Sequence, residues 1–408
     1  MRILYHHRTQ AEDGQAVHIR SLVRAFENEG AEVREVALVE KTGDSDPAKA
    51  GAKAAADTRP EAEAKAERGS RFPWSLVGRV PRFVREIAEY GYSVPAAKKL
   101  RAAVDAFDPN FVYERYAFGN TAGVRVADER GLPLVLEVNS PMVLELGRTR
   151  GLSFPGYARR VETSIFRRAD RIAVVTDVLG SMLVDMGVDA SRIFVTPNGV
   201  HLDHFEGLDA ASAREDLGIA HAEGPVLGFT GYYRDWHRLD LVVAGLAEDR
   251  NLKDAHLVLV GMGPVEDELR AQASALGVEG RVHFAGTRPH HRIPSVLAAF
   301  DVGLVPAINP YASPLKLHEY MAAGVVPVAP DQPNLREVLS DGEDSLLFSP
   351  GDGAALNDAL GRLATDAALR ERLGAAAART IVDRDLTWDG NARRVLAEVE
   401  TLRSTADR

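Results

Sequence analysis

Short apolar runs alternate with amphipathic stretches along most of the chain. The runs that read as strands cover residues 3–5, 33–39, 111–113, 134–138, 172–175 and 194–200 in the first half, and residues 226–231, 256–261, 282–286, 302–306 and 325–329 in the second. Stretches with helical spacing lie between them, among them residues 17–26, 178–186, 239–246 and 293–300. This alternation predicts an α/β fold with parallel sheets.

The second half restarts the pattern of the first, which predicts two Rossmann-like, doubly wound domains that face a cleft. A length of 408 residues also exceeds what one core usually supports. We expect an N-terminal domain over residues 1–204 and a C-terminal domain over residues 205–385. Residues 386–408 are expected to form a helix that crosses back to the N-terminal domain.

One part of the first half does not follow the pattern. Residues 41–70 are rich in Ala, Lys, Glu and Asp without an apolar stripe, and they read as an insertion or a solvated helix. From Arg71 to Arg85, arginines interleave with Phe, Trp, Leu and Val. Such a segment can contact an anionic membrane or a lipid-linked acceptor, but Gly78 and two prolines interrupt it, so packing on its own domain is the favoured alternative.

Composition narrows the possible functions. Apolar and charged residues make up 45% and 26% of the chain, as in ordinary globular proteins. The net charge of −10 argues against nucleic acid as a partner. The absence of cysteine excludes disulfides, thiolate metal sites and cysteine nucleophiles. The chain starts directly with a strand and has no apolar run of membrane-spanning length, so we expect a cytoplasmic protein, with peripheral contact at the inner membrane face as the alternative.

The stretch from Ser313 to Gly324 carries the clearest candidate chemistry. Ser313 suits an N-cap, Pro314 the first helical position and Gly324 a left-handed stop. Lys316 and Glu319 then share one face near the N-terminus of a short helix. Free amides and a lysine favour an anion such as a phosphate, and the carboxylate can accept hydrogen bonds from sugar hydroxyls. The alternative is an ordinary capped helix with a surface ion pair.

Several motifs in order resemble the GT4 family of retaining glycosyltransferases, which have the GT-B fold. The matching pieces are the Gly14 loop, residues 171–176, 195–200, 260–264, 282–286 and 313–324, and Glu337 with Asp341 and Gly342. The resemblance implies transfer of a sugar from a nucleotide diphosphate-sugar to a glycan, a lipid-linked acceptor or a small molecule. It also implies retention at the anomeric carbon, no cofactor and no bound metal.

Guided by the resemblance, we expect donor contacts from a set of residues in this sequence: Gly14, Gly231, Arg234, His237, Pro314, Leu315, Lys316 and Glu319. By resemblance, the loop after the first strand of the second domain carries two basic residues, and here Tyr232 and His237 hold those places. We expect Arg234, or alternatively Arg238, to supply the missing charge together with Lys316. Glu319 matches the family residue that holds the donor ribose, whereas Tyr311 stands where a further glutamate is expected.

In the first domain, Asn139 replaces the active-site histidine of the family. An asparagine can hydrogen-bond a donor hydroxyl but cannot act as a base, so the departing phosphate is expected to take the acceptor proton. The predicted catalytic residues are therefore Asn139, Arg234 and Lys316. Candidates for the acceptor side are Arg8, Arg115 and Glu145. The adjacent histidine pairs at residues 6–7 and 290–291 lack the further partners that a zinc site needs.

Two other functions remain open at this stage. A nucleotide-sugar epimerase with the GT-B fold would need an acid–base pair of carboxylates near the anomeric carbon, and the sequence shows no pair with suitable placement. A non-catalytic subunit that binds nucleotide-sugars is consistent with the missing glutamate at Tyr311 and with Asn139.

Overall fold

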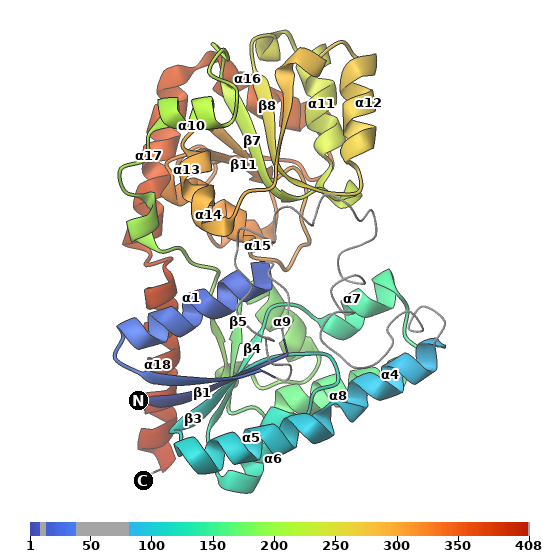
Figure 1. Ribbon diagram of the computed structural model, residues 1–408, viewed down its shortest axis with the longest axis vertical. Coiled ribbons are helices and arrows are strands. Elements are labelled where there is room, and N and C mark those ends of the chain that lie inside the picture. Colours follow the sequence, from blue (N-terminus) through green and yellow to red (C-terminus); the bar gives the residue numbers. More distant parts are fainter. Residues whose placement is uncertain (9–13, 38–80, 407–408) are drawn as a thin grey trace. The chain divides into compact units, whose positions relative to one another are not determined.

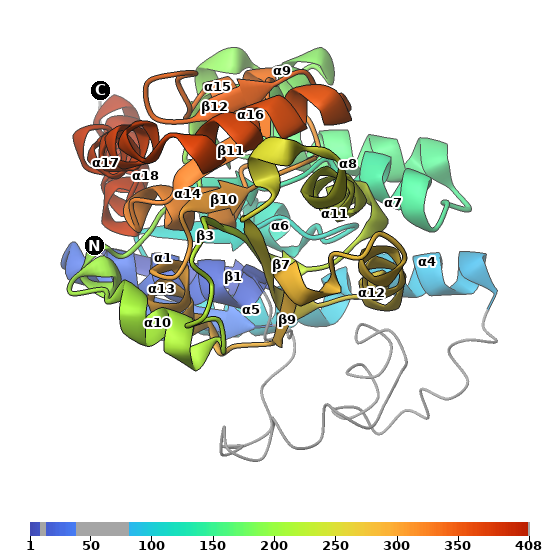
Figure 2. The ribbon, with the colours of Figure 1, turned by 90° about the horizontal axis from the view of Figure 1, so that it is seen from above.

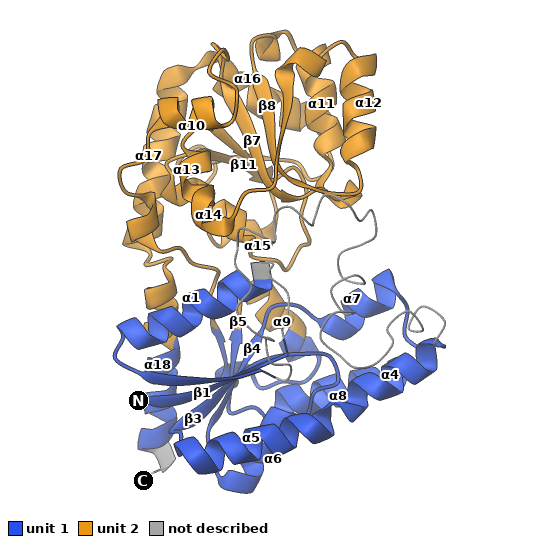
Figure 3. Cartoon of the chain, in the orientation of Figure 1, with its two compact units in different colours: residues 1–173, 183–194, 395–408 blue, residues 174–182, 195–394 orange. Residues whose placement is uncertain are grey.

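The computed structural model describes residues 1–8, 14–37 and 81–406. The chain forms two compact units (Figure 3): unit 1 contains residues 1–173, 183–194 and 395–408, and unit 2 contains residues 174–182 and 195–394. The predicted insertion at residues 41–70, and residues 71–80 of the arginine-rich segment, lie outside the described residues. In the described part of the chain, no helix is both long and apolar enough to cross a membrane.

Unit 1 is built on a six-stranded sheet with the order β2-β1-β3-β4-β5-β6. Its strands are β1 (Arg2–His7), β2 (Glu32–Ala37), β3 (Phe111–Arg115), β4 (Leu134–Val138), β5 (Arg171–Val174) and β6 (Ile193–Val195). Its helices are α1 (Gly14–Asn28), α4 (Arg82–Gly91), α5 (Ser93–Phe107), α6 (Ala122–Arg130), α7 (Met142–Thr149), α8 (Pro155–Arg168) and α9 (Asp177–Asp185), the last of which extends from unit 2 into unit 1. The strand β1 pairs in parallel with both β2 and β3. The chain order therefore reverses between β1 and β3, and ligands of such sheets bind at the carboxyl ends of strands at this position.

Unit 2 carries a second six-stranded sheet, ordered β12-β11-β10-β7-β8-β9. Its strands are β7 (Val226–Tyr232), β8 (His256–Met262), β9 (Val282–Gly286), β10 (Val302–Leu304), β11 (Val326–Pro330) and β12 (Leu346–Phe348), and all neighbours pair in parallel. This is the strand order of the Rossmann fold. The order reverses between β7 and β10, which predicts where a ligand of unit 2 binds.

Alternate residues of the central strands of unit 2 feed two separate cores. Leu227 and Phe229 of β7 belong to one core, whereas Val226 of the same strand and Val258 of β8 belong to the other. The first core is covered by α11 (Leu239–Glu248), α12 (Glu266–Ala275) and α16 (Gly353–Thr365); the second by α10 (Ala210–Asp216), α13 (Ile293–Leu297) and α14 (Leu315–Ala322), while α17 (Ala367–Asp383) contributes to both. Figures 1 and 2 show α11 and α12 on one side of this sheet and α13 and α14 on the other. A sheet buried on both faces explains its continuous apolar strands.

The helix at the centre of the sequence analysis is shorter than predicted. It begins at Leu315, because Pro314 has an extended backbone with ψ of 128° and occupies the N-cap position. Ser313 is therefore not the N-cap; its Oγ accepts a hydrogen bond from the backbone N–H of Asn198 at 3.2 Å. Gly324 has φ of +71°, which confirms the predicted left-handed stop.

The strand predicted at residues 194–200 is also shorter, since β6 ends at Val195. The domain limits at residues 204 and 385 stay a prediction, but the contacts group residues 174–182 and 195–204 with unit 2. Thr176 Oγ1 donates to the carbonyl of Tyr311 at 2.9 Å, and the N–H of Asp177 donates to Glu337 at 2.8 Å. Two α-helices remain to be named, the short α15 (Pro333–Arg336) and α18 (Trp388–Ala406). The helix α18 begins in unit 2, and from residue 395 it belongs to unit 1.

Candidate active site

The end of β7 in unit 2 is shaped by two glycines that have backbones few other residues adopt. Gly231 and Gly261 have φ of +131° and +139°. A Cβ atom on Gly261 would lie 1.9 Å from the carbonyl oxygen of Gly231, so the ends of β7 and β8 approach each other only because both residues lack side chains. A Cβ on Gly231 would lie 3.2 Å from Lys316 Nζ. The glycines thus make room for a cation at the switch point of the sheet.

Lys316 fills that room. Its Nζ lies 3.6 Å from the centroid of the Phe229 ring, and burial lowers the pKa of the ammonium to about 7, against a smaller opposing effect of Glu319. Among the described residues, no carboxylate lies within ion-pair distance of Lys316. The alternative of a surface ion pair with Glu319 is therefore wrong. The ammonium of Lys316 therefore has no counter-charge among the described residues, and this position can accept an anion.

The two arginines in the loop after β7 differ in the groups that they contact. The guanidinium of Arg234 lies 4.7 Å from the ring centroid of Tyr232 and 5.2 Å from that of Trp236, and no described carboxylate pairs with it. Arg238, in contrast, donates to Asp240 through Nε at 3.0 Å. Asp240 thus neutralises Arg238, while the exposed Arg234 keeps its charge available. The structure accordingly favours Arg234 for contact with an anion.

His237 supplies no charge to this loop. Its Nδ1 accepts a hydrogen bond from the backbone N–H of Arg234 at 3.3 Å. Burial, and then the positive charges of Lys316 and Arg234, lower the pKa of His237 to about 3. A neutral imidazole at this position can offer a hydrogen bond to a ligand but cannot replace a lysine.

Glu319 is buried, and its partner is one that the sequence did not reveal. His290 Nε2 lies 2.9 Å from Glu319 Oε1, so His290 orients the carboxylate. The contact uses one carboxylate oxygen, and Oε2 can accept a hydroxyl. Tyr311, which occupies the place of the missing glutamate, is buried to 4% exposure, and its carbonyl accepts a hydrogen bond from Thr176 Oγ1. Pro314 and Leu315 lie at the N-terminus of α14, as the family pattern requires.

A second candidate site occupies the switch point of unit 1. A cavity of about 390 Å³ is lined by Arg8 after β1, Arg115 at the end of β3, Asn139 after β4 and Glu145 on α7. The structure thus brings the three acceptor-side candidates and Asn139 into one cavity. Arg150, which the sequence analysis did not single out, also lines it and donates to both oxygens of Glu89, at 2.8 and 2.7 Å. Gly14 begins α1 and does not line this cavity.

Beneath the cavity, Glu137 of β4 holds a network that the sequence analysis missed. Glu137 is 1% exposed and accepts hydrogen bonds from Arg115, from Asn139 and, at 3.2 Å, from the hydroxyl of Tyr5. His18 Nε2 of α1 lies 3.1 Å from the same carboxylate. Burial alone would raise the pKa of Glu137, but Arg115 and His18 outweigh it and hold the pKa well below its usual range. The network fixes Asn139 and Arg115 in place.

The histidines of β1 are not free metal ligands either. His6 Nδ1 lies 2.8 Å from Glu114, and His7 Nε2 lies 2.9 Å from Glu35. Each ring thus contacts a carboxylate on a neighbouring strand of the sheet.

With both sites described, comparison with known proteins decides the family. A family model described as Glycosyltransferase Family 4 matches residues 13–204, and one described as Glycosyl transferases group 1 matches residues 224–366. The chain belongs to glycosyltransferase family 4. The two matched stretches contain every strand of the two sheets except β1, and nearly all of the candidate site residues, so the resemblance read from the motifs is confirmed.

Curated relatives, most of them named D-inositol 3-phosphate glycosyltransferases, align with 27% to 32% identity. The D-inositol 3-phosphate glycosyltransferase of Acidothermus cellulolyticus is 30% identical over 70% of this chain and 65% of its own length. The phosphatidyl-myo-inositol mannosyltransferase of Mycobacterium leprae is 32% identical over 58% and 60%. For the D-inositol 3-phosphate glycosyltransferase of Nocardia farcinica the values are 29%, 65% and 61%. The chain thus spans about three fifths of the length of these relatives.

Solved structures of low sequence identity have the same fold. Sucrose-phosphate synthase from Thermosynechococcus elongatus superposes with a TM-score of 0.74 at 19% identity, covering 99% of both chains. Anabaena HepE in complex with UDP gives 0.70 at 19% identity, covering 99% of this chain and all of HepE. The predicted fold class, GT-B with two Rossmann-like domains, is confirmed.

Proposed function

We propose that this protein is a retaining glycosyltransferase that moves a sugar from a nucleotide diphosphate-sugar to an acceptor without a metal ion. The observation that carries the proposal is the buried amine of Lys316 at the switch point of unit 2, beside Gly231 and close to the unpaired Arg234. A diphosphate matches this surplus of positive charge. HepE, which shares the fold, binds UDP and UDP-glucose, and this supports a nucleotide-sugar as the donor.

In the proposed step, the bond between the anomeric carbon and the diphosphate oxygen breaks, and the electron pair stays on the diphosphate. Lys316 and Arg234 stabilise that developing charge, which otherwise would need a cation. The acceptor oxygen bonds to the anomeric carbon on the face that the leaving group vacates, so the configuration is retained. Because Asn139 cannot take a proton, the departing phosphate oxygen accepts the hydroxyl proton.

Glu319 holds the donor ribose in this proposal. His290 fixes its carboxylate through Oε1, and Oε2 is available for the ribose hydroxyls. Glu319→Ala should weaken binding of UDP, GDP or ADP by roughly ten- to a hundredfold, the usual value of a hydrogen bond to a charged group. His291→Ala is the matched control, because His291 is exposed on the same turn and has no part in the site. Unchanged affinity in Glu319→Ala, measured by calorimetry, would remove the ribose role.

We infer that the acceptor binds in the cavity of unit 1. Its lining of three arginines, two of them paired with carboxylates, and Glu145 suits a polyhydroxylated acceptor. The guanidinium of Arg8 lies over the Tyr92 ring at 4.7 Å and is placed to hold an acidic group on that acceptor. Relatives are named for inositol 3-phosphate and for phosphatidylinositol, and both names include a phosphate. Arg8→Ala should raise the KM for phosphorylated acceptors more than for neutral ones.

The decisive experiment measures release of the nucleoside diphosphate from a panel of nucleotide-sugars, with and without a panel of inositols, inositol phosphates and sugars. A transferase releases it faster with one acceptor and forms an α-linked product from an α-linked donor. An epimerase instead changes the sugar of the donor alone, and a non-catalytic subunit binds the donor without turnover. Either of the last two outcomes would overturn the proposal.

We also propose weak, salt-sensitive contact of the segment from Arg71 to Arg85 with anionic membranes. In its described part, which begins α4, Phe83 and Val84 are 48% and 41% exposed beside Arg82. Arginines attract anionic headgroups, and exposed apolar side chains can enter the interface. Co-sedimentation with anionic vesicles should exceed that with neutral vesicles and fall in high salt. Equal sedimentation with both kinds of vesicle would contradict the proposal.

A further inference from the structure

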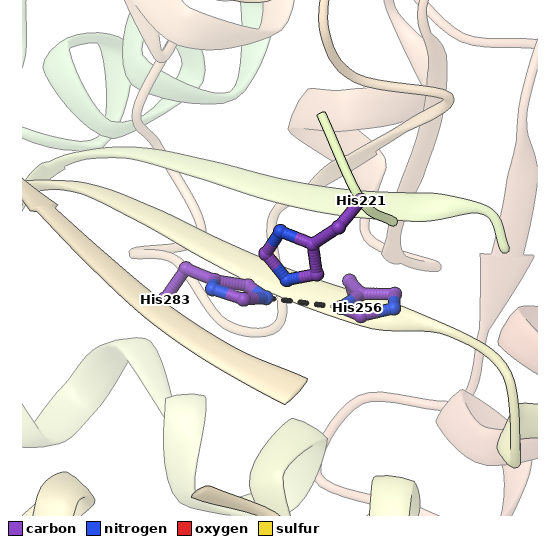
Figure 4. Close-up of side chains that lie close together, drawn as sticks. All are labelled: His221, His256 and His283. Atoms are coloured by element: carbon purple, nitrogen blue, oxygen red, sulfur yellow. Dashed lines mark hydrogen bonds between the residues drawn. The ribbon is translucent and has the colours of Figure 1, made fainter. Parts of the chain in front are cut away.

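Three histidines far apart in the sequence meet at the starts of the strands in unit 2. His221 lies in the loop before β7, His256 is the first residue of β8, and His283 is the second residue of β9. One ring nitrogen from each lies within 4.8 Å of the others. Figure 4 shows the His221 ring lying against both others, with a hydrogen bond between the other two. In the described part of the chain, this is the one group of three possible metal ligands.

The fold accounts for the convergence. In the β8–β9 ladder His283 pairs with Val258, which is two residues after His256. Residues two apart on a strand project from the same face, so His256 and His283 are neighbours on one face of the sheet. His221 reaches them from a loop anchored by Ile219, which is fully buried in the second core. The backbone N–H of Ala222 donates to the carbonyl of Ile219 at 2.9 Å and fixes the turn.

We propose that His221, His256 and His283 bind one Zn²⁺ ion, with water as the fourth ligand. His256 Nδ1 and His283 Nε2 are 2.9 Å apart. In a tetrahedral zinc site the Zn–N distances are about 2.0–2.1 Å, which places two ligand nitrogens roughly 3.3 Å apart. The nitrogens of His256 and His283 therefore need to separate by only a few tenths of an ångström, and the His221 nitrogen, which lies within 4.8 Å of both, must approach them. The exposed position of His221 gives an ion and its water a path from solvent.

The protonation of the cluster suits a metal. Burial lowers the pKa of His256, and it lowers the pKa of His283 to about 4, with the neighbouring histidines adding to both effects. His256 and His283 are thus neutral at pH 7, as metal ligands must be. One of these two rings donates the hydrogen bond between them. When its nitrogen binds the metal, the proton moves to the other nitrogen of the same ring, so these two rings release no net proton.

The surroundings select against other ions. Imidazole donors suit Zn²⁺, whereas Ca²⁺ and Mg²⁺ require oxygen ligands, and the cluster has none from the chain. Arg214 and Arg281 lie close enough to affect His256, and both are held by other groups. Arg214 pairs with Asp301 at 3.0 Å, and Arg281 donates to the carbonyl of Leu252 at 2.7 Å. Two nearby cations weaken a site for a divalent ion, so we expect moderate affinity.

The proposed ion has a structural role and not a catalytic one. It would join the loop before β7, the strand β8 and the edge strand β9. His256 begins β8, whereas Gly261 lies near the opposite end of that strand, next to Gly231 at the start of the loop after β7. The site is therefore on the other edge of the sheet from Lys316, and its occupancy should leave binding of nucleotides unchanged.

The test titrates chelator-treated protein with ZnCl₂ by calorimetry. We expect one ion per chain, an increase in the unfolding temperature, and a dissociation constant weakened at least tenfold in His221→Ala, since even outer-shell partners of a metal contribute roughly 10–100-fold. His221 is exposed, so this variant should fold. His291→Ala, a second exposed histidine in unit 2, should bind zinc like the wild type.

A second variant, His283→Gln, keeps the size and polarity of the side chain and should lose the same affinity. Equal zinc affinity in the wild type and in both His221→Ala and His283→Gln would overturn the site. UDP, GDP and ADP are then titrated with and without Zn²⁺. Nucleotide affinity that changes with zinc occupancy would overturn the structural role, and unchanged affinity would support it. Failure of glycosyl transfer has no bearing on either measurement.

Discussion

Both candidate sites lie where the strand order of a parallel sheet reverses, but their positive charges differ in whether a carboxylate of the chain neutralises them. In unit 1, Arg115 is paired with Glu137 and Arg150 with Glu89, so most of the positive charge is compensated within the chain. In unit 2, Lys316 and Arg234 have no carboxylate partner among the described residues. A buried cation that is paired with a carboxylate destabilises the fold little and can position neutral groups. A buried cation without a carboxylate raises the free energy of the ligand-free site and therefore favours binding of an anion. The difference supports our proposal that the diphosphate of the donor binds in unit 2 and the acceptor in unit 1.

The largest effect should come from breaking the compensation in unit 1. Glu137→Ala leaves Arg115 and His18 without their buried counter-charge and should lower the local free energy of unfolding by about 3–5 kcal/mol. Hydrogen exchange of the β3 and β4 amides measures it. The control Glu398→Ala loses only a partly exposed pair with Arg171 and should cost about 0–1 kcal/mol. Similar losses in both variants would show that the Glu137 network carries no special weight.

The same carboxylate sets a pH window. The pKa of Glu137 is lower in the folded protein than its ordinary value of 4.5, so its contribution to stability is present above pH 4.5 and is lost as the pH falls toward the folded pKa. The stability difference between wild type and Glu137→Gln should therefore shrink on acidification below pH 4.5. A difference that stays constant from pH 7 to pH 3 would contradict the charge-based explanation.

In unit 2, removal of a positive charge should weaken nucleotide binding and should not lower the stability of the fold. Lys316→Met removes a charge-assisted contact with the diphosphate and should weaken UDP, GDP or ADP binding by roughly ten- to a hundredfold. Because burial already penalises the charged amine, the ligand-free variant should unfold at the same temperature as wild type or higher. Calorimetry and thermal unfolding test the two parts. A strongly destabilised variant with normal affinity would reverse our assignment.

Lys316 also predicts how donor affinity depends on pH. Its folded pKa of about 7 lies below the ordinary 10.5, so above pH 7 the free protein must take up a proton when it binds a diphosphate. Nucleotide affinity should fall by up to about tenfold per pH unit above pH 7. Over the same range the ligand-free fold gains stability, because the unfolded state binds more protons. Lys316→Arg should flatten the affinity profile, and an equally steep profile in that variant would exclude Lys316 as its source.

The smallest effect distinguishes the two arginines of the donor loop. Arg234→Ala should weaken nucleotide binding by roughly a few-fold to tenfold, since its exposed charge is screened. Arg238→Ala should change binding less, because Asp240 already neutralises that guanidinium. Equal losses in both variants would mean that the loop acts through its overall charge and not through Arg234.

The sequence predicted some of these features and not others for physical reasons. The strands β4 and β9 have the predicted limits because buried apolar runs end where polar residues or glycine follow. The predicted start of α14 was wrong because the Ser313 hydroxyl accepts a hydrogen bond from the backbone N–H of Asn198, which is 115 residues away in the sequence. The sequence favoured Arg234 but left Arg238 as an alternative, since the difference between them depends on how Arg238 turns back to Asp240.

The polar network of unit 1 left no local signal. Glu137 is a single acid within an apolar strand, and its partners Tyr5 and Arg115 lie 132 and 22 residues away. Likewise, the histidines at 221, 256 and 283 follow no motif spacing, and only the strand register brings them together. The cavity residues Arg8, Arg115 and Glu145 were named in advance because each follows a strand end or begins the next helix, where ligands of α/β sheets gather.

The helix α18 has a consequence for how the protein is made. Unit 1 needs residues 395–408, and Arg171 of β5 pairs at 2.8 Å with Glu398 of α18, 227 positions later. Residues from Val195 to Arg394, most of unit 2, leave the ribosome before that last segment. During synthesis the first unit to begin is therefore the last to be finished, and a C-terminal truncation damages the N-terminal half. Expression of residues 1–194 alone should yield a sheet that lacks part of its cover, and adding a 395–408 peptide in trans is the way to restore it.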